Sequence, residues 1–204
     1  MEPQYHTLYD HGVLSYTRES LDGLGMPDKT VEMLVHRGMP VFDPQEPPLG
    51  LLFHEALPLQ DIHEAYIAIG REIWSEGLLV AIRQDTGAVW AVTEGSAQKP
   101  TYMNASIDSL LAFMDRVLRF KQHTERLQPD PPPMILTAEQ FREKLRSSEE
   151  ERSSRNRSDA LQAEREWKSA FEQMKRELKD MDPNAVRSSS WWGIVLEEMK
   201  ERLR

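Results

Sequence analysis

The sequence of 204 residues contains no cysteine. Without thiols the chain cannot form disulfides, bind zinc through thiolates or use a cysteine as a nucleophile. No stretch approaches about 18 consecutive apolar residues, so we expect no membrane-spanning helix. The N-terminal segment has neither a basic start nor an apolar run, and we therefore expect no signal peptide and a cytoplasmic location.

Basic residues are fewer than acidic residues in this chain. The chain has 25 Lys or Arg against 34 Asp or Glu, a formal net charge of −9. The whole imbalance lies in residues 1–135, which hold 10 basic and 19 acidic residues, while residues 136–204 hold 15 of each. Proteins that bind nucleic acid directly place clustered Lys and Arg against the phosphates. The acidity therefore argues against direct nucleic-acid binding.

Catalytic and metal-binding motifs are missing or incomplete. A single Asp-Thr-Gly at 85–87 matches the tripeptide of aspartic proteases, which need two copies, and turn chemistry alone explains it. His54-Glu55 and His63-Glu64 lack the second histidine that a zinc-protease helix carries. No phosphate-binding loop, dinucleotide-binding motif or nucleophile elbow occurs. We therefore expect no catalytic residue, no metal, no cofactor and no enzymatic activity.

A run of prolines divides the chain. Residues 129–135 begin with Pro-Asp-Pro-Pro-Pro, which no helix can cross. We predict an α+β domain over residues 1–128, a Pro-rich linker over 129–135, and a helical extension over 136–204 that is docked in part on the first domain. The predicted α+β fold has a central mixed, largely antiparallel sheet with flanking helices, followed by the all-helical C-terminal extension.

Residues 1–128 predict a helix, then a sheet, then a second helix. The expected elements are a helix over 27–37, a loop over 43–50, a strand over 66–70, a hairpin with strands 77–83 and 88–93 around a turn at 84–87, and a helix over 104–122. Gly38 is placed to end the first helix in the left-handed conformation. Either Asn104 or Ser106 is available as the N-cap of the last helix.

The C-terminal part predicts helices with one aromatic patch. Residues 137–147 predict a helix, and residues 147–158 are either a solvated helix face or a flexible link. An apolar seam follows: Trp167, Phe171, Met174, Leu178 and Met181. Asp182-Pro183 predicts the N-cap and first residue of a new helix. Trp191 and Trp192 either dock on the first domain, which we expect, or offer a surface to a partner.

Residues 43–76 contain seven carboxylates and a single basic residue, Arg71. This charge either serves ordinary solubility or forms a negative docking face for a basic protein partner. Under the second interpretation the predicted partner-binding residues are Asp43, Glu46, Glu55, Asp61, Glu64, Glu72, Trp74 and Glu76.

Four segments, in order and spacing, carry a resemblance to a known family. They are VHRGMP at 35–40, YIAIG at 66–70, the hairpin from 78 to 92, and YMNASI at 102–107. Together they resemble the fourth subfamily of the SUKH superfamily, the immunity proteins of bacterial polymorphic toxin systems. Met39 and Ala105 depart mildly from that pattern. The positions that match the family or its C-terminal extension are Gly38, Pro40, Gly70, Gly87, Asn104, Ser106, Trp191 and Trp192.

The resemblance implies an α+β module with a cleft that binds a partner protein. It also implies a non-catalytic role in neutralising toxin domains, many of which act as nucleases or nucleic-acid deaminases. We therefore expect an immunity protein that occludes a basic toxin domain. The alternative is a regulatory interaction module of the same fold, acting in signalling or envelope assembly without a toxin.

Overall fold

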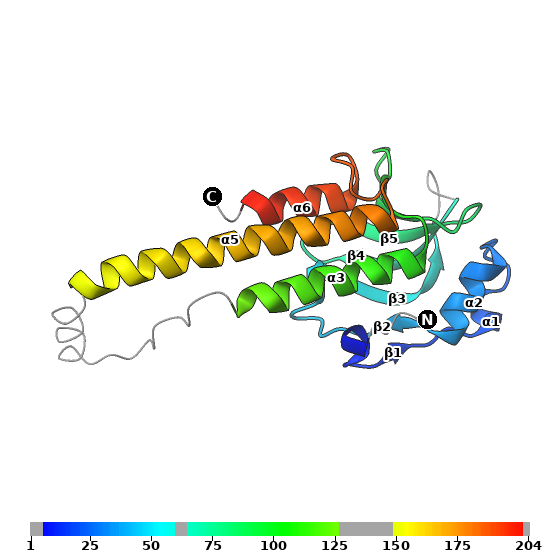
Figure 1. Cartoon of the computed structure of the whole chain (residues 1–204). Helices are drawn as coiled ribbons and strands as arrows, with labels where there is room; N and C mark the ends of the chain where they lie inside the picture. Colours follow the sequence, from blue (N-terminus) through cyan, green and yellow to red (C-terminus); the bar gives the residue numbers. More distant parts are fainter. Residues whose placement is uncertain (1–5, 60–64, 127–148, 202–204) are drawn as a thin grey trace. The chain divides into compact units, whose positions relative to one another are not determined.

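The computed structural model describes residues 6–59, 65–126 and 149–201 (Figure 1). The chain divides into two compact units. One comprises Met1–Leu118 together with Lys175–Arg204, and the other comprises Arg119–Met174. The predicted linker at 129–135 and the predicted helix at 137–147 lie outside the described residues.

An antiparallel sheet forms the centre of the first unit. Its strands are β3 (Leu51–Pro58), β4 (Tyr66–Glu72), β5 (Leu78–Arg83), β6 (Val89–Thr93) and β7 (Thr101–Asn104). They are hydrogen-bonded in that order, and every pairing is antiparallel. The short strands β1 (Val13–Leu14) and β2 (Met39–Pro40) form a second antiparallel pair. The α+β class is therefore confirmed, with only antiparallel neighbours among the described strands.

The predicted hairpin is present as β5 and β6. Val80 pairs with Ala91 and Ile82 with Val89, so the apolar residues of the two strands face each other across the ladder. The turn is closed by the Arg83 N–H, which donates to the Ala88 carbonyl at 2.8 Å. Two short apolar strand segments separated by a turn with Asp and Gly are sufficient to specify this local pairing.

Short helices precede the sheet. They are η1 (His6–Tyr9), α1 (Arg18–Leu21), α2 (Asp28–His36) and η2 (Pro48–Gly50). Helix α2 confirms the helix predicted at 27–37. Gly38 follows it with φ +70°, and its N–H donates to the Leu34 carbonyl at 3.0 Å. This left-handed residue ends the helix as expected.

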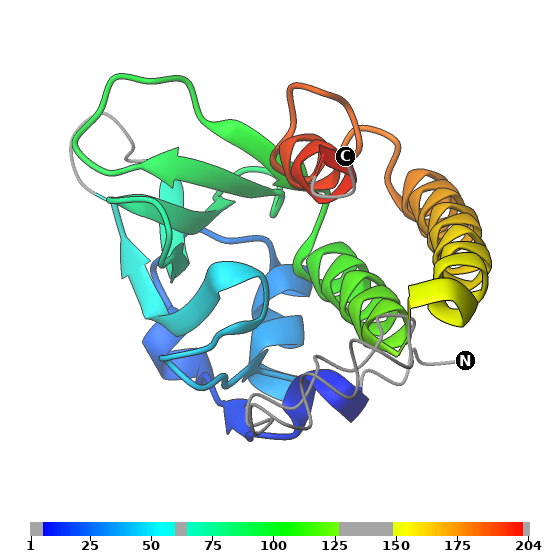
Figure 2. The ribbon, with the colours of Figure 1, turned by 90° about the vertical axis from the view of Figure 1, so that its left-hand side faces the viewer.

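Helix α3 (Ile107–Glu125) supplies the apolar stripe that the sequence predicted. Its residues up to Leu118 belong to the first unit and lie beside the sheet (Figures 1 and 2). The buried apolar positions of α3 up to Leu118 are Ile107, Leu110, Leu111, Phe113, Met114 and Val117. The buried residues of the sheet include Ile67, Ile69, Val80, Ile82 and Val89. Burial of these branched and aromatic side chains is the main source of stability.

Helix α5 (Glu149–Met181) continues through residues 149–158, so the helical alternative holds for this stretch. Within the second unit Trp167 stacks on Phe171, with ring centroids 4.9 Å apart. Phe120, on α3, meets both rings edge-on at 5.2 and 5.8 Å. Of the predicted seam, Phe171, Met174 and Leu178 are buried, whereas Met181 is 43% exposed.

The helix predicted to begin at Asp182-Pro183 is not present. The chain instead turns through residues 183–190, and helix α6 (Trp191–Glu201) begins only afterwards. Asp182 does accept hydrogen bonds from the Asn184 and Ala185 N–H groups, as an N-cap would. The helix start is set by Ser190, whose Oγ accepts from the Gly193 N–H at 3.1 Å. Figure 2 shows α6, in red, next to β7.

Candidate partner-binding surface

Asn104, at the end of β7, is a fully buried polar residue that organises the first unit. Its Oδ1 accepts a hydrogen bond from Trp192 Nε1 at 2.7 Å, and its Nδ2 donates to Ser109 Oγ at 3.2 Å. Trp191 and Trp192 are both buried, and they meet edge-on with centroids 4.9 Å apart. The tryptophan pair is therefore committed to packing and is not available to a partner.

Asp182 makes a second connection between the C-terminal segment and β7. Its Oδ2 accepts from the Tyr102 hydroxyl at 3.0 Å and from the Ala105 N–H at 2.8 Å. Burial and this hydrogen bond hold the pKa of Tyr102 well above its usual value. The side chain of Asp182 is itself buried, so its oxygens depend on these donors.

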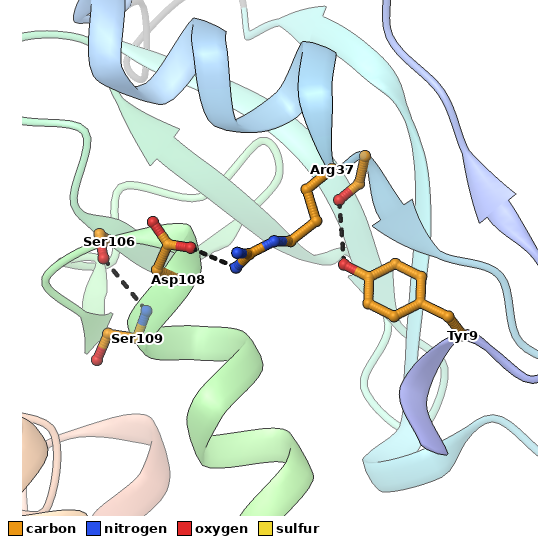
Figure 3. Close-up of polar contacts among 6 residues, drawn as sticks. Tyr9, Arg37, Ser106, Asp108 and Ser109 are labelled. Atoms are coloured by element: carbon orange, nitrogen blue, oxygen red, sulfur yellow. Dashed lines mark hydrogen bonds and ion pairs between the residues drawn. The ribbon is translucent and has the colours of Figure 1, made fainter. Parts of the chain in front are cut away.

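The segment joining α2 to β2 meets the start of α3 (Figure 3). Arg37 Nη1 donates to Asp108 Oδ1 at 2.7 Å, and the Tyr9 hydroxyl donates to the Gly38 carbonyl at 3.4 Å. Ser106 is the N-cap of α3, because its Oγ accepts from the Ser109 N–H at 3.2 Å. Of the two N-cap candidates, Ser106 makes the capping hydrogen bond, whereas the buried Asn104 side chain bonds to Trp192 and Ser109.

The other family-motif positions are sites where backbones approach closely. A Cβ on Gly38 or on Gly70 would lie 2.5 Å from a carbonyl oxygen, of Leu14 and of Leu52 respectively. Pro40 is buried and pairs with Val13. Gly87 is buried in the β5–β6 turn, where a Cβ would collide with Thr30 of α2. All of these positions serve the fold rather than an exposed site.

The resemblance implies a cleft that binds a partner, and the first unit contains two cavities. One, of about 460 Å³, lies between α1 and α2 and is lined by Glu19, Asp22 and Asp28 over Leu21 and Met26. The other, of about 180 Å³, is lined by residues of α2, by the β5–β6 turn and by the start of α3. Gly87 and Ser106 line the smaller cavity, and none of the predicted partner-binding residues that the structure describes lines either cavity.

The predicted partner-binding residues fall on three segments. Asp43 and Glu46 are exposed in the loop before η2, and Glu76 is exposed in the turn after β4. Glu72 is half-buried at the end of β4, where it pairs with Leu51. Glu55 is exposed on β3 at the irregularity between Phe53 and Leu57. Asp61 and Glu64 lie outside the described residues.

Trp74 joins two of these segments. The Ile73 N–H donates to the Gly50 carbonyl at 2.8 Å, and this bond brings the end of β4 against the end of the 43–50 loop. A Cβ on Gly50 would lie 2.7 Å from Cδ2 and Cε3 of Trp74. Despite this contact, Trp74 is 67% exposed. We call Asp43, Glu46, Glu72, Trp74 and Glu76 the Trp74 surface.

Carboxylates dominate the Trp74 surface. Asp43 Oδ1 accepts from the Gln45 N–H at 2.8 Å, a local turn contact that leaves its second oxygen open. Within the described residues, none of the four carboxylates forms an ion pair with a Lys or Arg. Sequence reasoning did not identify Gly50 as part of this surface, because no local motif marks a glycine that supports a distant ring.

Glu55 belongs to a different neighbourhood. The Tyr16 hydroxyl donates to the His54 carbonyl at 2.6 Å. Burial, together with the negative charge of Glu55, raises the pKa of Tyr16 far above its usual value. Glu55 therefore lies near Tyr16 of the N-terminal segment.

Two residues that superficially matched enzyme motifs, Asp85 and His54, have structural partners, and His63-Glu64 lies outside the described residues. Asp85 pairs with Arg83, with 2.8 Å between Oδ1 and Nε, and His54 Nδ1 lies 2.6 Å from the Glu55 carbonyl oxygen. Among the side chains that the structure describes, those of residues 8–59, 65–126 and 161–201, no three His, Asp or Glu converge as they would around a metal ion. The described helices also include none that is long and apolar enough to cross a membrane.

The two tyrosines with raised pKa values predict an alkaline loss of stability. In the unfolded chain they release protons near pH 10, whereas the folded state holds them protonated. Their contribution is therefore complete below about pH 10 and is lost as the pH rises above it. The free energy of unfolding should therefore show no loss from these tyrosines up to about pH 10 and should fall progressively from about pH 10 to about pH 12. Tyr16→Phe and Tyr102→Phe should each flatten that fall, and unchanged slopes would contradict the assignment.

A family model described as SUKH-4 immunity protein matches residues 8–198. No curated protein and no solved structure matches the chain.

Proposed function

The chain belongs to the SUKH-4 immunity protein family, and from this premise we propose that it binds and occludes a basic toxin domain, a nuclease or a nucleic-acid deaminase. Family membership supports an immunity role with a protein toxin as the partner. The sign of the partner's charge and the binding face are our inference from the residues.

The observation that carries the proposal is the Trp74 surface. Its four carboxylates form no ion pair with a Lys or Arg among the described residues. They lie on the same two segments as Trp74 and Gly50, and the Trp74 ring is 67% exposed. Toxins that act on nucleic acid bind phosphates with Lys and Arg. A surface of unpaired carboxylates presents a similar negative field, attracts such a domain and covers the groove that would hold its substrate.

Charge reversal on the Trp74 surface should weaken toxin binding. The double variant Glu46→Lys/Glu76→Lys places two cations where a basic partner would dock. We expect its affinity for the cognate toxin domain, identified by pull-down from the host, to fall at least about 10-fold, mostly through a slower association rate that depends strongly on salt. Calorimetry and stopped-flow kinetics at two salt concentrations would measure both effects.

The control is Glu197→Lys/Glu201→Lys, which changes the net charge equally through two exposed residues of α6. We expect this variant to bind nearly as the native protein does. Equal weakening by both double variants would show that only the overall charge matters. If the chain neither binds that toxin nor protects cells that express it, the immunity proposal fails. A stoichiometric partner without toxic activity would favour a regulatory interaction module.

A further inference from the structure

The indole of Trp74 lies with one face over Gly50. The three ring atoms nearest to a Cβ on Gly50 would be Cδ2, Cε3 and Cε2, at 2.7, 2.7 and 3.0 Å. Cδ2 is a fusion carbon bonded to both of the others. A point equally close to it and to Cε3 must lie above the ring plane, because in-plane approaches meet the rim atoms first. One face of the indole is therefore supported by backbone.

Only glycine permits this arrangement. Gly50 has φ +69°, in the left-handed region, and any side chain there would enter the space of the indole. Since Trp74 remains 67% exposed, its opposite face is open to solvent. Tryptophan is enriched among the residues that carry most of the binding energy at interfaces, so an exposed indole supported on one face by backbone is suited to contact a partner.

The charge around the ring selects one kind of occupant. Glu72 and Glu76 each lie two residues from Trp74 in the chain, and Glu46 lies four residues before Gly50. An aromatic face attracts cations, and carboxylates at its edge add to that attraction. Guanidinium is planar and weakly hydrated, so it can stack on the ring while its N–H groups point outward to carboxylates. An ammonium ion keeps its hydration and cannot stack in this way.

We propose that Trp74 is a stacking platform for an arginine side chain of the partner protein, supported from below by Gly50 and flanked by the carboxylates of Glu72 and Glu76. This inference rests on the proposed function, because it names the group by which a basic toxin would engage the Trp74 surface.

A direct test uses model peptides and the indole N–H signals of the full chain. Acetyl-Gly-Arg-Gly-Arg-Gly-amide is titrated into the ¹⁵N-labelled protein, and the same peptide with citrulline in place of arginine serves as the neutral isostere. Trp74 is assigned from Trp74→Phe. We expect the arginine peptide to shift the Trp74 signal several times more than the citrulline peptide does, with the buried Trp191 and Trp192 signals unmoved. Equal shifts with both peptides, or none, would overturn the proposal.

The support from Gly50 is tested by a matched pair of variants. Gly50→Ala displaces the ring, whereas Gly95→Ala imposes the same left-handed strain, at φ +64°, where a Cβ would meet nothing within 4 Å. We expect the arginine-dependent shift to disappear in Gly50→Ala and to persist in Gly95→Ala. Loss in both variants would point to backbone strain and would count against the platform.

Toxin binding by two variants of Trp74 distinguishes a failure of the stacking platform from a failure of the proposed immunity function. Trp74→Phe keeps an aromatic face and should weaken binding only slightly, whereas Trp74→Leu keeps apolar area alone and should weaken it about 10-fold. If Phe and Leu bind the toxin equally well, the platform is wrong and the immunity function stands. If the chain binds no toxin, the proposed function falls, and the peptide titration still decides the platform.

Discussion

Replacing Trp192 with alanine should lower the free energy of unfolding by about 3–5 kcal/mol. Trp192 is fully buried, its ring centroid lies 5.4 Å from that of Phe113, and its Nε1–H donates to Asn104. The substitution leaves a cavity and removes the indole N–H that donates to Asn104 Oδ1, so two costs add. Urea unfolding followed by far-UV circular dichroism measures the change without relying on tryptophan fluorescence.

The matched control is Trp74→Ala, which removes the same side chain from an exposed position. We expect it to change the free energy of unfolding by less than about 1 kcal/mol. Trp192→Phe should fall between the two, because phenylalanine fills part of the space but cannot donate to Asn104. Similar losses for Trp192→Ala and Trp74→Ala would contradict the assignment of one ring to packing and the other to a surface.

Replacing Asp182 with alanine should cost about 2–4 kcal/mol. Its two oxygens accept hydrogen bonds from Tyr102, Ala105, Asn184 and Ala185. All of these donors lose their acceptor together, and bonds to a charged acceptor are stronger than neutral ones. The same urea titration gives the magnitude.

Two control variants test whether the loss of stability is specific to the Asp182 carboxylate. Asp180→Ala removes an exposed carboxylate two residues away and should change stability by less than about 0.5 kcal/mol. Asp182→Asn keeps one acceptor oxygen and should give an intermediate loss. A cost for Asp182→Ala no larger than that for Asp180→Ala would mean that the turn after α5 does not depend on this carboxylate.

Local pattern was enough to predict several elements. Helix α2 and its end at Gly38, the β5–β6 hairpin and helix α3 all depend on interactions between residues a few positions apart. Strands β3 and β7 were missed. β3 is an edge strand with an irregular register and a terminal Pro58, so it shows no clean alternation of apolar and polar residues. β7 has only four residues, too few to establish a period.

The predicted site was recovered in part. The acidic character of residues 43–76 and the exposure of Trp74 could be proposed from composition. The assembly of Trp74 with the 43–50 loop could not, because it depends on how Gly50 approaches the end of β4. The predicted set also included Glu55, which the structure places near Tyr16 instead.

The sequence by itself determined the distribution of charge, the local helices and the central hairpin, and the order of motifs that identifies the family. These properties are additive over residues or depend on short-range geometry. Tertiary structure alone decided that Asn104 and Trp192, 88 residues apart, form one buried hydrogen bond. It also decided that Asp182 bonds to β7 and that Gly50 supports Trp74. Such contacts form between segments that are far apart in the sequence, and their spacing along the chain does not indicate which segments come together.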